Sequence, residues 1–344
     1  MLFEIQRCGN EFPDRAKRGR LFLDKIAGYA GPDTLWRSFL KSESERLGKR
    51  DDSVLFHDEL NEQSYSPLYF HDFMKQAHAK NLQFLSEARL RDMLAPALSP
   101  EAASGLAELA QEDTTSHQQY LDFALFQAFR RTLLCRQTVT IDRHGPTSRI
   151  TNLFVASPLK ARRDHTTDGS TTFDNSRGAG RIQTNDLAIV SALRHLESSW
   201  PEAEPFEVVL QVVCRDLPKI PQHEVKTALR KGFLELAVND LIDLRTYTGS
   251  ASSKAGLNPK ASPLCRLQAT NDSTVTTLLH TNVDIADPTA RLCLTMLDGT
   301  RGANDLAREL FGGTKPEVKK KEEMLTQLLA GFKALGLFFS DSTL

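Results

Sequence analysis

Apolar residues recur at the 3.6-residue period of a helix along the start of the chain. This spacing predicts three successive helices over 13–30, 31–50 and 53–60. Pro13 suits the start of the first helix, and Ser53 is the expected N-cap of the third. The same period assigns these large side chains to the inward faces of the first two helices: Leu21, Phe22, Ile26, Tyr29, Leu35, Trp36, Phe39 and Leu40.

The next eighty or so residues continue mainly as helices. Pro67 begins a predicted helix that is capped near Asn81, and the run 82–85 fits a strand or an extended connection. Ser99 is placed to cap a further helix. The longest predicted helix covers 117–137 and carries apolar residues around much of its circumference, so we expect it to be central and largely buried. The helix that follows Pro67 has an apolar stripe of Tyr69, Phe70, Phe73, Met74 and Ala77.

The pattern changes after Gln137. Segments 138–142 and 150–159 are rich in residues that favour strands. The stretch 160–186 is polar and rich in Thr, Asp and Gly, which is typical of a loop or an exposed hairpin. The main domain boundary is expected in this region.

Two rounds of helices followed by strands fill the remainder. Three helices are predicted at 185–200, 205–214 and 222–241. Segments 241–249 and 263–269 then read as paired strands around a Gly/Ser-rich tip. Three helices followed by a two-stranded wing describe a winged helix.

The plan recurs more compactly from residue 271, with three helices and a closing strand at 337–340. The predicted fold is therefore mainly α with small β elements, an α+β class. It is a helical domain followed by two winged-helix-like units. The expected divisions are a helical lead-in at 1–52, the helical domain at 53–137, a β/loop connector at 138–182, and winged-helix-like domains at 183–269 and 270–344.

Composition narrows the function classes. The chain has 344 residues, of which 40% are apolar and 25% charged, and its net charge is −1. This balance gives no strong field toward nucleic acid or an anionic membrane. No window approaches the roughly 20 apolar residues of a membrane helix, and the N-terminus lacks the core of a signal peptide. A cytoplasmic location with reduced thiols is expected, because five cysteines are scattered and form no CxxC pair: Cys8, Cys135, Cys214, Cys265 and Cys293.

Three histidines raise the question of a metal or catalytic site. His71 and His78 are seven residues apart, so they project from one helical face about 10 Å apart, too far to bind one zinc as neighbours. The favoured interpretation is that they satisfy backbone groups or line an interface. A hydrolase or metalloenzyme around His57, His71 and His78 is kept as an alternative that metal analysis decides.

Two glycines and a cysteine suggest further sites, each with a simpler structural interpretation. Gly178 and Gly180 lack the preceding apolar strand and third glycine of a nucleotide fingerprint, and a hairpin turn is favoured. Cys135 is expected to end an apolar helix as a buried small hydrophobe.

A winged helix can also bind nucleic acid. The expected recognition helix carries Lys226, Arg230 and Lys231, and a separate basic stretch runs from Lys160 to Asp164. The same helix is also acidic, which weakens the case for phosphate binding, through Glu224, Glu235 and Asp240.

The strings "LFHDEL", "SPLYFHDFMKQAHAKNLQFLSEARL" and "QQYLDFALFQAFRRTLLC", over about 54–135, resemble the methyltransferase regulatory domain family. In that family the module usually follows a class I S-adenosylmethionine-dependent methyltransferase domain. The rickettsial-type protein lysine methyltransferases are similar in plan, with a winged-helix-like C-terminal part. Residues 183–344 resemble that part, and "LTMLDGTRGANDLARELF" is similar to small winged-helix modules that begin with an "LDGT" turn.

Two departures from the family pattern matter. Gln118 and Gln127 stand where relatives usually have an acidic residue and an arginine, so an amide pair would replace an ion pair. No glycine-rich turn after a strand, with an acidic residue ending the next strand, precedes residue 54. S-adenosylmethionine is therefore expected on a partner or on a missing N-terminal domain, and no cofactor in this chain. An accessory subunit, a truncated gene product and a misassigned start all remain open.

The resemblance implies a non-catalytic regulatory or substrate-positioning part of a methyltransferase system, with protein methylation as one form. Its expected partners are a methyltransferase catalytic domain or a protein substrate, with a homodimer left open and no membrane. A winged-helix nucleic-acid-binding regulator is the alternative, and nucleic acid is disfavoured as a partner. The expected interaction face comprises Tyr69, His71, Asp72, Glu87, Tyr120, Asp122 and Arg130.

Overall fold

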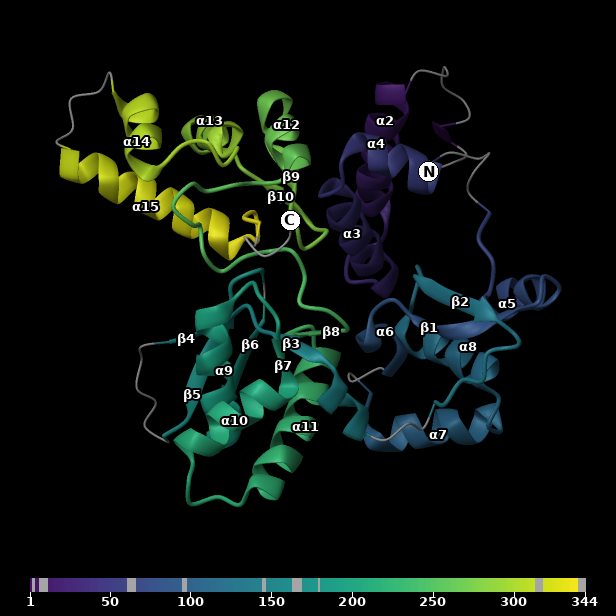
Figure 1. Cartoon of the computed structure of the whole chain (residues 1–344). Coiled ribbons are helices and arrows are strands. Elements are labelled where there is room, and N and C mark those ends of the chain that lie inside the picture. Colours follow the sequence, from purple (N-terminus) through teal and green to yellow (C-terminus); the bar gives the residue numbers. More distant parts are fainter. Residues whose placement is uncertain are drawn as a thin grey trace. The chain divides into compact units, whose positions relative to one another are not determined.

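The structure is a computed structural model that describes residues 1, 4–5, 12–60, 66–94, 98–143, 147–162, 169–178, 180–312 and 318–339 (Figure 1). The chain divides into two compact units. The first unit comprises Met1–Gln83 and Ala110–Leu125, and the second comprises Phe84–Leu109 and Phe126–Leu344. The α+β class with small antiparallel sheets is confirmed.

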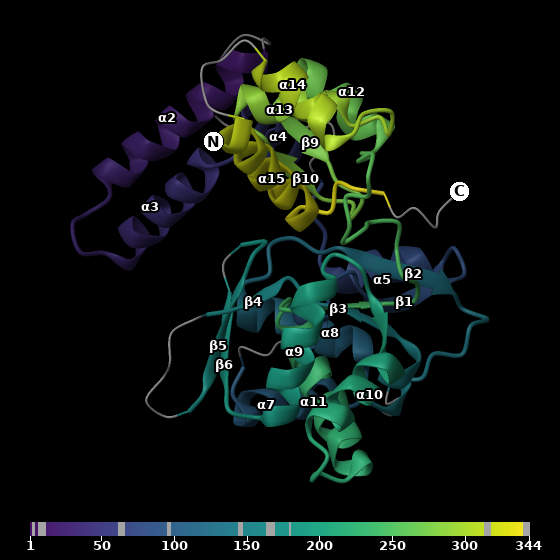
Figure 2. The same cartoon turned by 60° about the vertical axis from the view of Figure 1, so that its left-hand side comes forward.

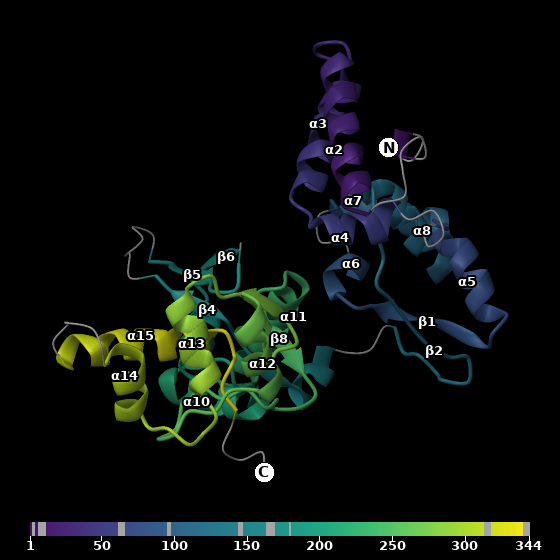
Figure 3. The same cartoon turned by 90° about the horizontal axis from the view of Figure 1, so that it is seen from above.

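A helical hairpin dominates the first unit. Helices α2 (Phe12–Tyr29) and α3 (Leu35–Gly48) lie side by side (Figure 3). The α3 start is fixed by Thr34, whose side chain accepts a hydrogen bond from the Arg37 backbone N–H. Short α4 (Asp52–Leu55) and a π-helical turn η1 (Phe56–Leu60) close the core, which contains Ala16, Leu23, Ala27, Leu40, Leu47, Leu55 and Leu60.

Two sequence predictions about this hairpin are wrong. Of the side chains assigned inward, only Leu40 is fully buried, while Phe22 and Ile26 are half-buried. Leu23, Ala27 and Leu47 join Leu40 in the core instead, and most of the side chains assigned inward are exposed. The cap of α4 is Asp51 and not Ser53, because the Asp51 carboxylate accepts the Ser53 backbone N–H. The exposed large side chains are Leu21, Tyr29, Leu35, Trp36 and Phe39.

Helix α5 (Phe70–His78) packs on α8 (Thr114–Leu125), also in the first unit. It begins three residues after Pro67, and Phe70, Met74 and Ala77 form its buried face. Asn81 follows the helix end with φ 59°, a conformation that suits asparagine. Strand β1 (Leu82–Glu87) then confirms the extended interpretation of 82–85.

The predicted helix over 117–137 is wrong in its second half. Helix α8 ends at Leu125, Phe126 takes φ 52°, and strand β2 (Thr132–Arg136) pairs with β1. The residues 132–136 therefore belong to a small sheet, and tertiary pairing overrides their helical spacing. The expectation of burial also fails, because Phe123 is 60% exposed.

Two short helices lie between β1 and α8, namely α6 (Leu90–Leu94) and α7 (Pro100–Ala110). The cap predicted for α7 is confirmed, because the Ser99 hydroxyl accepts the Ala102 backbone N–H at 3.2 Å. Pro100 occupies the first helical position, where its lack of an N–H costs nothing.

A winged-helix-like domain fills the middle of the second unit. Its helices are α9 (Leu187–Ser199), α10 (Phe206–Asp216) and α11 (Gln222–Val238), as the sequence predicts. Strand β3 (Phe154–Ala156) lies between β7 (Glu204–Pro205) and β8 (Asp243–Arg245), antiparallel to both. A short 3-10 helix η2 (Thr147–Asn152) precedes β3.

The polar stretch after residue 160 forms the predicted hairpin. Strands β4 (Leu159–Ala161), β5 (Thr171–Asn175) and β6 (Arg181–Thr184) make an antiparallel sheet, which lies beside α9 (Figure 2). Phe173 anchors this sheet in the domain core. The expected strand at 138–142 is not formed.

The wing predicted from 263–269 is also wrong. That segment is helix α12 (Pro263–Asn271), and Cys265 and Ala269 belong to the core of the C-terminal domain. Helix α12 therefore opens the next domain, and β8 finds its partner in β3 instead. Strands β9 (Thr274–Thr276) and β10 (Asn282–Asp284) form the hairpin of that domain.

Three helices follow as predicted: α13 (Pro288–Met296), α14 (Ala303–Phe311) and α15 (Val318–Ala334). The closing segment is extended, with isolated bridges from Phe338 to Ala261 and from Phe339 to Ala251. No helix among the described residues is long and apolar enough to cross a membrane.

Trp200 and Glu202, just after α9, form polar contacts with later segments of the second unit. The Trp200 indole N–H donates to the Ala334 carbonyl at 2.8 Å. The Glu202 carboxylate accepts from both the Ser252 hydroxyl and the Ser253 backbone N–H. The chain that follows α9 is therefore bonded both to the end of α15 and to the segment that precedes α12.

Candidate functional site

The seven residues of the expected interaction face divide between the two units. The first unit holds five of them on α5 and α8, and the second unit holds Glu87 and Arg130. Glu87 and Arg130 are in direct contact, and in the first unit α5 packs on α8. The α5–α8 set comprises Tyr69, His71, Asp72, Tyr120 and Asp122.

Exposed aromatic rings mark the α5–α8 surface. Tyr69 is the N-cap residue of α5 and is 64% exposed. Its ring meets Phe123 edge to face, with 5.8 Å between the ring centroids. Phe70 and Leu121, beside them in sequence, are buried and hold the two helices together. The aromatic pair is therefore presented by a packed scaffold, with much of its apolar surface open.

The first turn of α5 is fixed from α8. The buried Gln119 side chain accepts the His71 backbone N–H through Oε1 at 3.1 Å. The His71 ring is exposed, with Nδ1 3.6 Å from Asp72 Oδ1, and Lys75 lies 3.5 Å from the same carboxylate oxygen. These surface pairs contribute little to stability. They give the patch a mixed charge next to its aromatic rings.

The described part of the chain contains no group of three or more His, Cys, Asp or Glu side chains that could hold one metal ion. His57 instead meets the Phe56 ring edge to face. His78 ends α5 at an exposed position.

In the second unit, the Glu87 carboxylate is the most completely buried charged group at the predicted site, with a side chain 1% exposed. It accepts from Arg130 Nη1 at 2.5 Å, from the Arg131 backbone N–H at 3.1 Å and from the Thr132 hydroxyl at 3.1 Å. A buried carboxylate needs this number of donors to offset its loss of hydration. Glu87 is thus a structural anchor and not an exposed contact residue.

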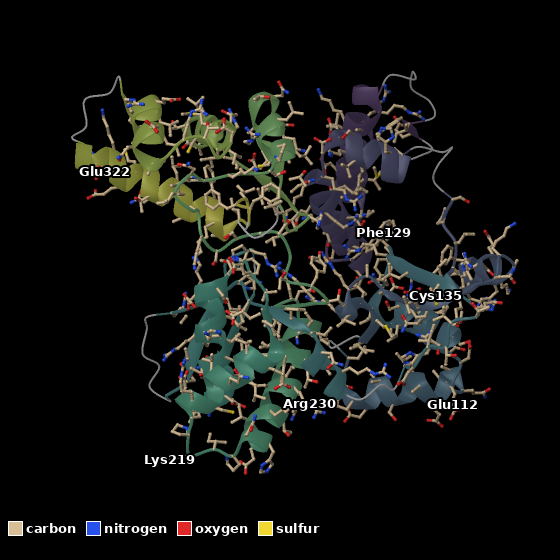
Figure 4. The ribbon with its side chains drawn as sticks, viewed as in Figure 1. Glu112, Phe129, Cys135, Lys219, Arg230 and Glu322 are labelled. Atoms are coloured by element: carbon tan, nitrogen blue, oxygen red, sulfur yellow. The ribbon has the colours of Figure 1, made fainter. Side chains whose placement is uncertain are left out.

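This anchor fixes the chain that precedes β2. Arg130, Arg131 and Thr132 are held at consecutive positions, directly after the segment 126–129. Phe126 is 73% exposed and Phe129 is 72% exposed. Phe129 is labelled in Figure 4. The sequence analysis missed both as surface residues, because it assigned them to a buried helix. The signal available in the sequence was the number of apolar residues, which exceeds what one helix face can bury.

Strand β1 is held from a second direction. Arg143 donates to the Leu85 carbonyl at 3.0 Å and to the Phe84 carbonyl, and its guanidinium stacks over the Phe84 ring, 5.2 Å from the centroid. The β1–β2 sheet is therefore braced by side chains as well as by its own strand pairing.

Other residues chosen from the sequence have structural positions. Cys135 lies half-buried in β2 and does not end a helix (Figure 4). Gly178 and Gly180 lie between β5 and β6, where Gly180 takes φ 145°, so the hairpin turn is confirmed. Gln118 is buried, and the Gln127 side chain donates to the Phe129 carbonyl at 2.6 Å.

The basic residues considered for nucleic-acid binding differ in their contacts. Lys226 is paired with Glu207 at 2.7 Å, and Lys160 is exposed on β4. Asp164 lies outside the described residues. Exposed Glu224, Glu235 and Asp240 accompany the basic side chains of α11, as the sequence suggests.

The exposed aromatic side chains of this region support contact with another protein more directly than they support a catalytic reaction. Rigid aromatic side chains supply contact area at a low cost in conformational entropy, and such residues are enriched at protein interfaces. Tyr69 and Phe123 in one unit, and Phe126 and Phe129 in the other, have this character.

Comparison with known proteins identifies the modules. Residues 51–136 match the family described as "Predicted methyltransferase regulatory domain", and residues 258–329 match "PKMT, C-terminal winged helix domain". Both predicted resemblances are thereby confirmed. The second match begins before α12, in agreement with the place of this helix in the C-terminal core.

Full-length comparisons extend the likeness. "Uncharacterized protein RP789" of Rickettsia prowazekii (strain Madrid E) is 24% identical over 335 residues, covering 92% of this chain and 60% of that protein. The chain thus spans about 60% of the length of this curated relative.

Two solved structures of PKMT2 from Rickettsia typhi share the fold. One, in complex with AdoHcy, is 22% identical with a TM-score of 0.82 and covers 98% of this chain and 70% of that chain. The other is 21% identical with a TM-score of 0.82 and covers 94% and 69%, respectively.

Proposed function

We propose that this chain, whose residues 51–136 match a methyltransferase regulatory domain, regulates an S-adenosylmethionine-dependent methyltransferase and positions its substrate. The observation that carries the proposal is the braced β1–β2 sheet inside the matched region. Glu87 holds the turn from which Phe126 and Phe129 project. A fixed, exposed aromatic surface fits a module whose work is to contact another protein domain.

The partners in this proposal are a methyltransferase catalytic domain and a protein substrate. The match to a PKMT C-terminal domain favours protein methylation, since the solved relatives are PKMT2 structures. A homodimer would also cover exposed aromatic residues, and light scattering of the purified protein distinguishes it from a monomer.

The cofactor belongs, in this proposal, to a class I methyltransferase domain and not to the residues described above. Support comes from the small size of the described sheets, which have two or three strands each. A doubly wound cofactor-binding domain is built on a larger parallel sheet. The PKMT2 relative with bound AdoHcy is longer than the matched region, since this chain covers 70% of it.

Calorimetry with S-adenosylmethionine and S-adenosylhomocysteine tests the placement of the cofactor. We expect no saturable heat from this chain alone. Intact Rickettsia typhi PKMT2, which has been solved in complex with AdoHcy, serves as the comparison. Micromolar binding of either compound by this chain would refute the placement of the cofactor elsewhere.

Methyl transfer tests the regulatory role. Radioactive methyl incorporation into a protein substrate is measured for intact Rickettsia typhi PKMT2, with and without this chain. We expect the rate to change when the chain is added, and the effect to be lost when Phe126 and Phe129 are both replaced by serine. An unchanged rate, or an effect that survives both replacements, contradicts the proposal.

A further inference from the structure

A pocket of about 650 Å³ lies on the second unit, at the hairpin that carries Gly180. Its walls come from α6, from β6, from the start of α9 and from one face of α11. Volumes of this size are typical of ligand sites. The floor includes Ile182, Ile189 and Leu241, and the rim is polar.

Three positively charged side chains line this pocket. Arg91 comes from α6, Arg181 from β6 and Lys231 from α11, and all three are exposed. None of the three has an ion-pair partner within the described ranges. Three unpaired cations from different elements around one hollow leave a positive potential there, despite the overall charge of −1.

Two carboxylates also line the pocket, and they act differently. Asp186 is the N-cap of α9, where its carboxylate accepts the backbone N–H groups of Ala188 and Ile189. The partial positive charge of the helix start offsets its charge. Glu235 is exposed, one helical turn after Lys231. Glu235 is thus the one acidic group of the rim without such compensation.

A second hollow of about 420 Å³ continues across α11. It is lined by Thr227, Arg230 and Leu234, and it shares Lys231 and Glu235 with the first pocket. Arg230 adds a further cation to this side (Figure 4). An α-helix with its side chains is about 10–12 Å wide. A ligand that fills both hollows must therefore be extended, and a single phosphate would fill only a part of one.

We propose that this track binds an acidic peptide segment of a protein partner. Its carboxylates would meet Arg91, Arg181, Lys231 and Arg230, and its apolar side chains would cover the floor at Ile182 and Leu241. The site goes beyond the proposed function and does not need it. Cofactor calorimetry and peptide binding are separate measurements, so either can fail alone.

The probe is a rhodamine-labelled dodecapeptide of Glu-Leu-Ser-Glu repeated three times, and fluorescence anisotropy measures its binding to the full chain. The comparison peptide has lysine in place of each glutamate. Inorganic phosphate and a single-stranded oligonucleotide of similar length are tested as competitors. We expect saturable binding of the acidic peptide that weakens as salt is added, with the basic peptide at least about tenfold weaker.

Charge variants locate the site. Arg181→Glu and Lys231→Glu should each weaken binding about tenfold, whereas Glu235→Gln should strengthen it about threefold at low salt. The matched control is Arg215→Glu, an exposed arginine of α10 whose side chain lies outside both hollows. Thermal unfolding confirms that each variant is folded.

The outcomes separate the alternatives. If Arg215→Glu weakens binding as much as Lys231→Glu, attraction is general and the site is refuted. If the wild-type chain does not bind the acidic peptide, or if Glu235→Gln weakens binding, the inference is overturned. An oligonucleotide that displaces the peptide at lower concentration than the unlabelled peptide itself would overturn the assignment to a protein partner.

Discussion

Replacement of Glu87 by alanine is the most direct test of how the regulatory domain holds its exposed surface. The change removes a carboxylate whose side chain is 1% exposed and which accepts three hydrogen bonds. The Arg130 side chain, 14% exposed, is left without this charge partner. Breaking a buried ion pair in this way typically costs about 3–5 kcal/mol.

The lower end of that range is expected here. Arg130 retains some contact with water, so its loss of a partner is partly compensated. The Arg131 N–H and the Thr132 hydroxyl each lose an acceptor, at about 1–3 kcal/mol for a group that stays buried. We therefore expect the free energy of unfolding to fall by about 3 kcal/mol. Replacing both Glu87 and Arg130 by alanine should cost less than the sum of the two single changes.

Hydrogen exchange and chemical denaturation measure this prediction. Peptides covering 130–136 should exchange faster in Glu87→Ala, while peptides from the core of α9 should change less, because local opening precedes global unfolding. Glu108→Gln, an exposed change in the last turn of α7, is the control and should leave the denaturation midpoint unchanged. If Glu87→Ala lies within about 0.5 kcal/mol of the wild type, or if the two changes are additive, the carboxylate does not anchor this turn.

Three further predictions concern the second unit. Gly232→Ala should destabilise the middle domain by about 1–3 kcal/mol, since its Cβ would lie 2.3 Å from Ile189 Cδ1. Chemical denaturation measures this cost in the wild type and in an Ile189→Ala background, where the clash is removed. If Gly232→Ala is equally destabilising in both backgrounds, the prediction is contradicted. Hydrogen bonds from the Thr300 hydroxyl and backbone N–H, with help from Arg301, lower the pKa of Asp298 to about 2. The stability that this carboxylate contributes should therefore be present above about pH 4 and lost as the pH falls toward 2. The acid denaturation profile of Asp298→Asn should lack this loss of stability. A profile identical to that of the wild type would refute the prediction. Burial raises the pKa of Cys265 to about 11 and of Cys293 to about 12. A thiol reagent should therefore modify both only on unfolding, after it has modified the half-buried cysteines of β2 and α10. Rapid reaction of Cys265 and Cys293 in the folded protein would show that the core is not closed.

Local sequence signals predicted most helices of the middle and C-terminal domains, with α12 as the exception. Segments such as 187–199 and 222–238 carry apolar residues at helical spacing, with Asp186 and Pro221 at their starts. These local signals agree with the burial that follows, because Leu193 and Leu229 lie in the same core. Local periodicity and capping therefore sufficed where one helix face packs on one core.

Strand partners could not be read in the same way. Segment 263–269 was expected to pair with 241–249, yet it is helical and its Cys265 is buried among C-terminal residues. Strand β8 pairs with β3, about ninety residues earlier in the chain. Short apolar runs satisfy both a strand and a helix pattern, and only the available partner decides between them.

The candidate site shows the same division. The strings around Tyr69 and Arg130 were sufficient to recognise the regulatory domain, which the family comparison confirms. Their physical roles were not contained in those strings. Glu87 is buried by donors 43 to 45 residues away, and the chain turns at Phe126 where the periodicity predicted continued helix.

What the sequence determined was therefore the set of modules and most of the helices, because these depend on neighbours a few residues apart. The tertiary structure alone decided which charges are structural and which remain free. Glu87 is buried and hydrogen-bonded to the chain that precedes β2. Arg181 and Lys231, in contrast, have no ion-pair partner among the described residues and line a pocket formed from distant segments. The physical reason is that desolvation and ion pairing depend on groups brought together by folding, and sequence spacing does not record those distances.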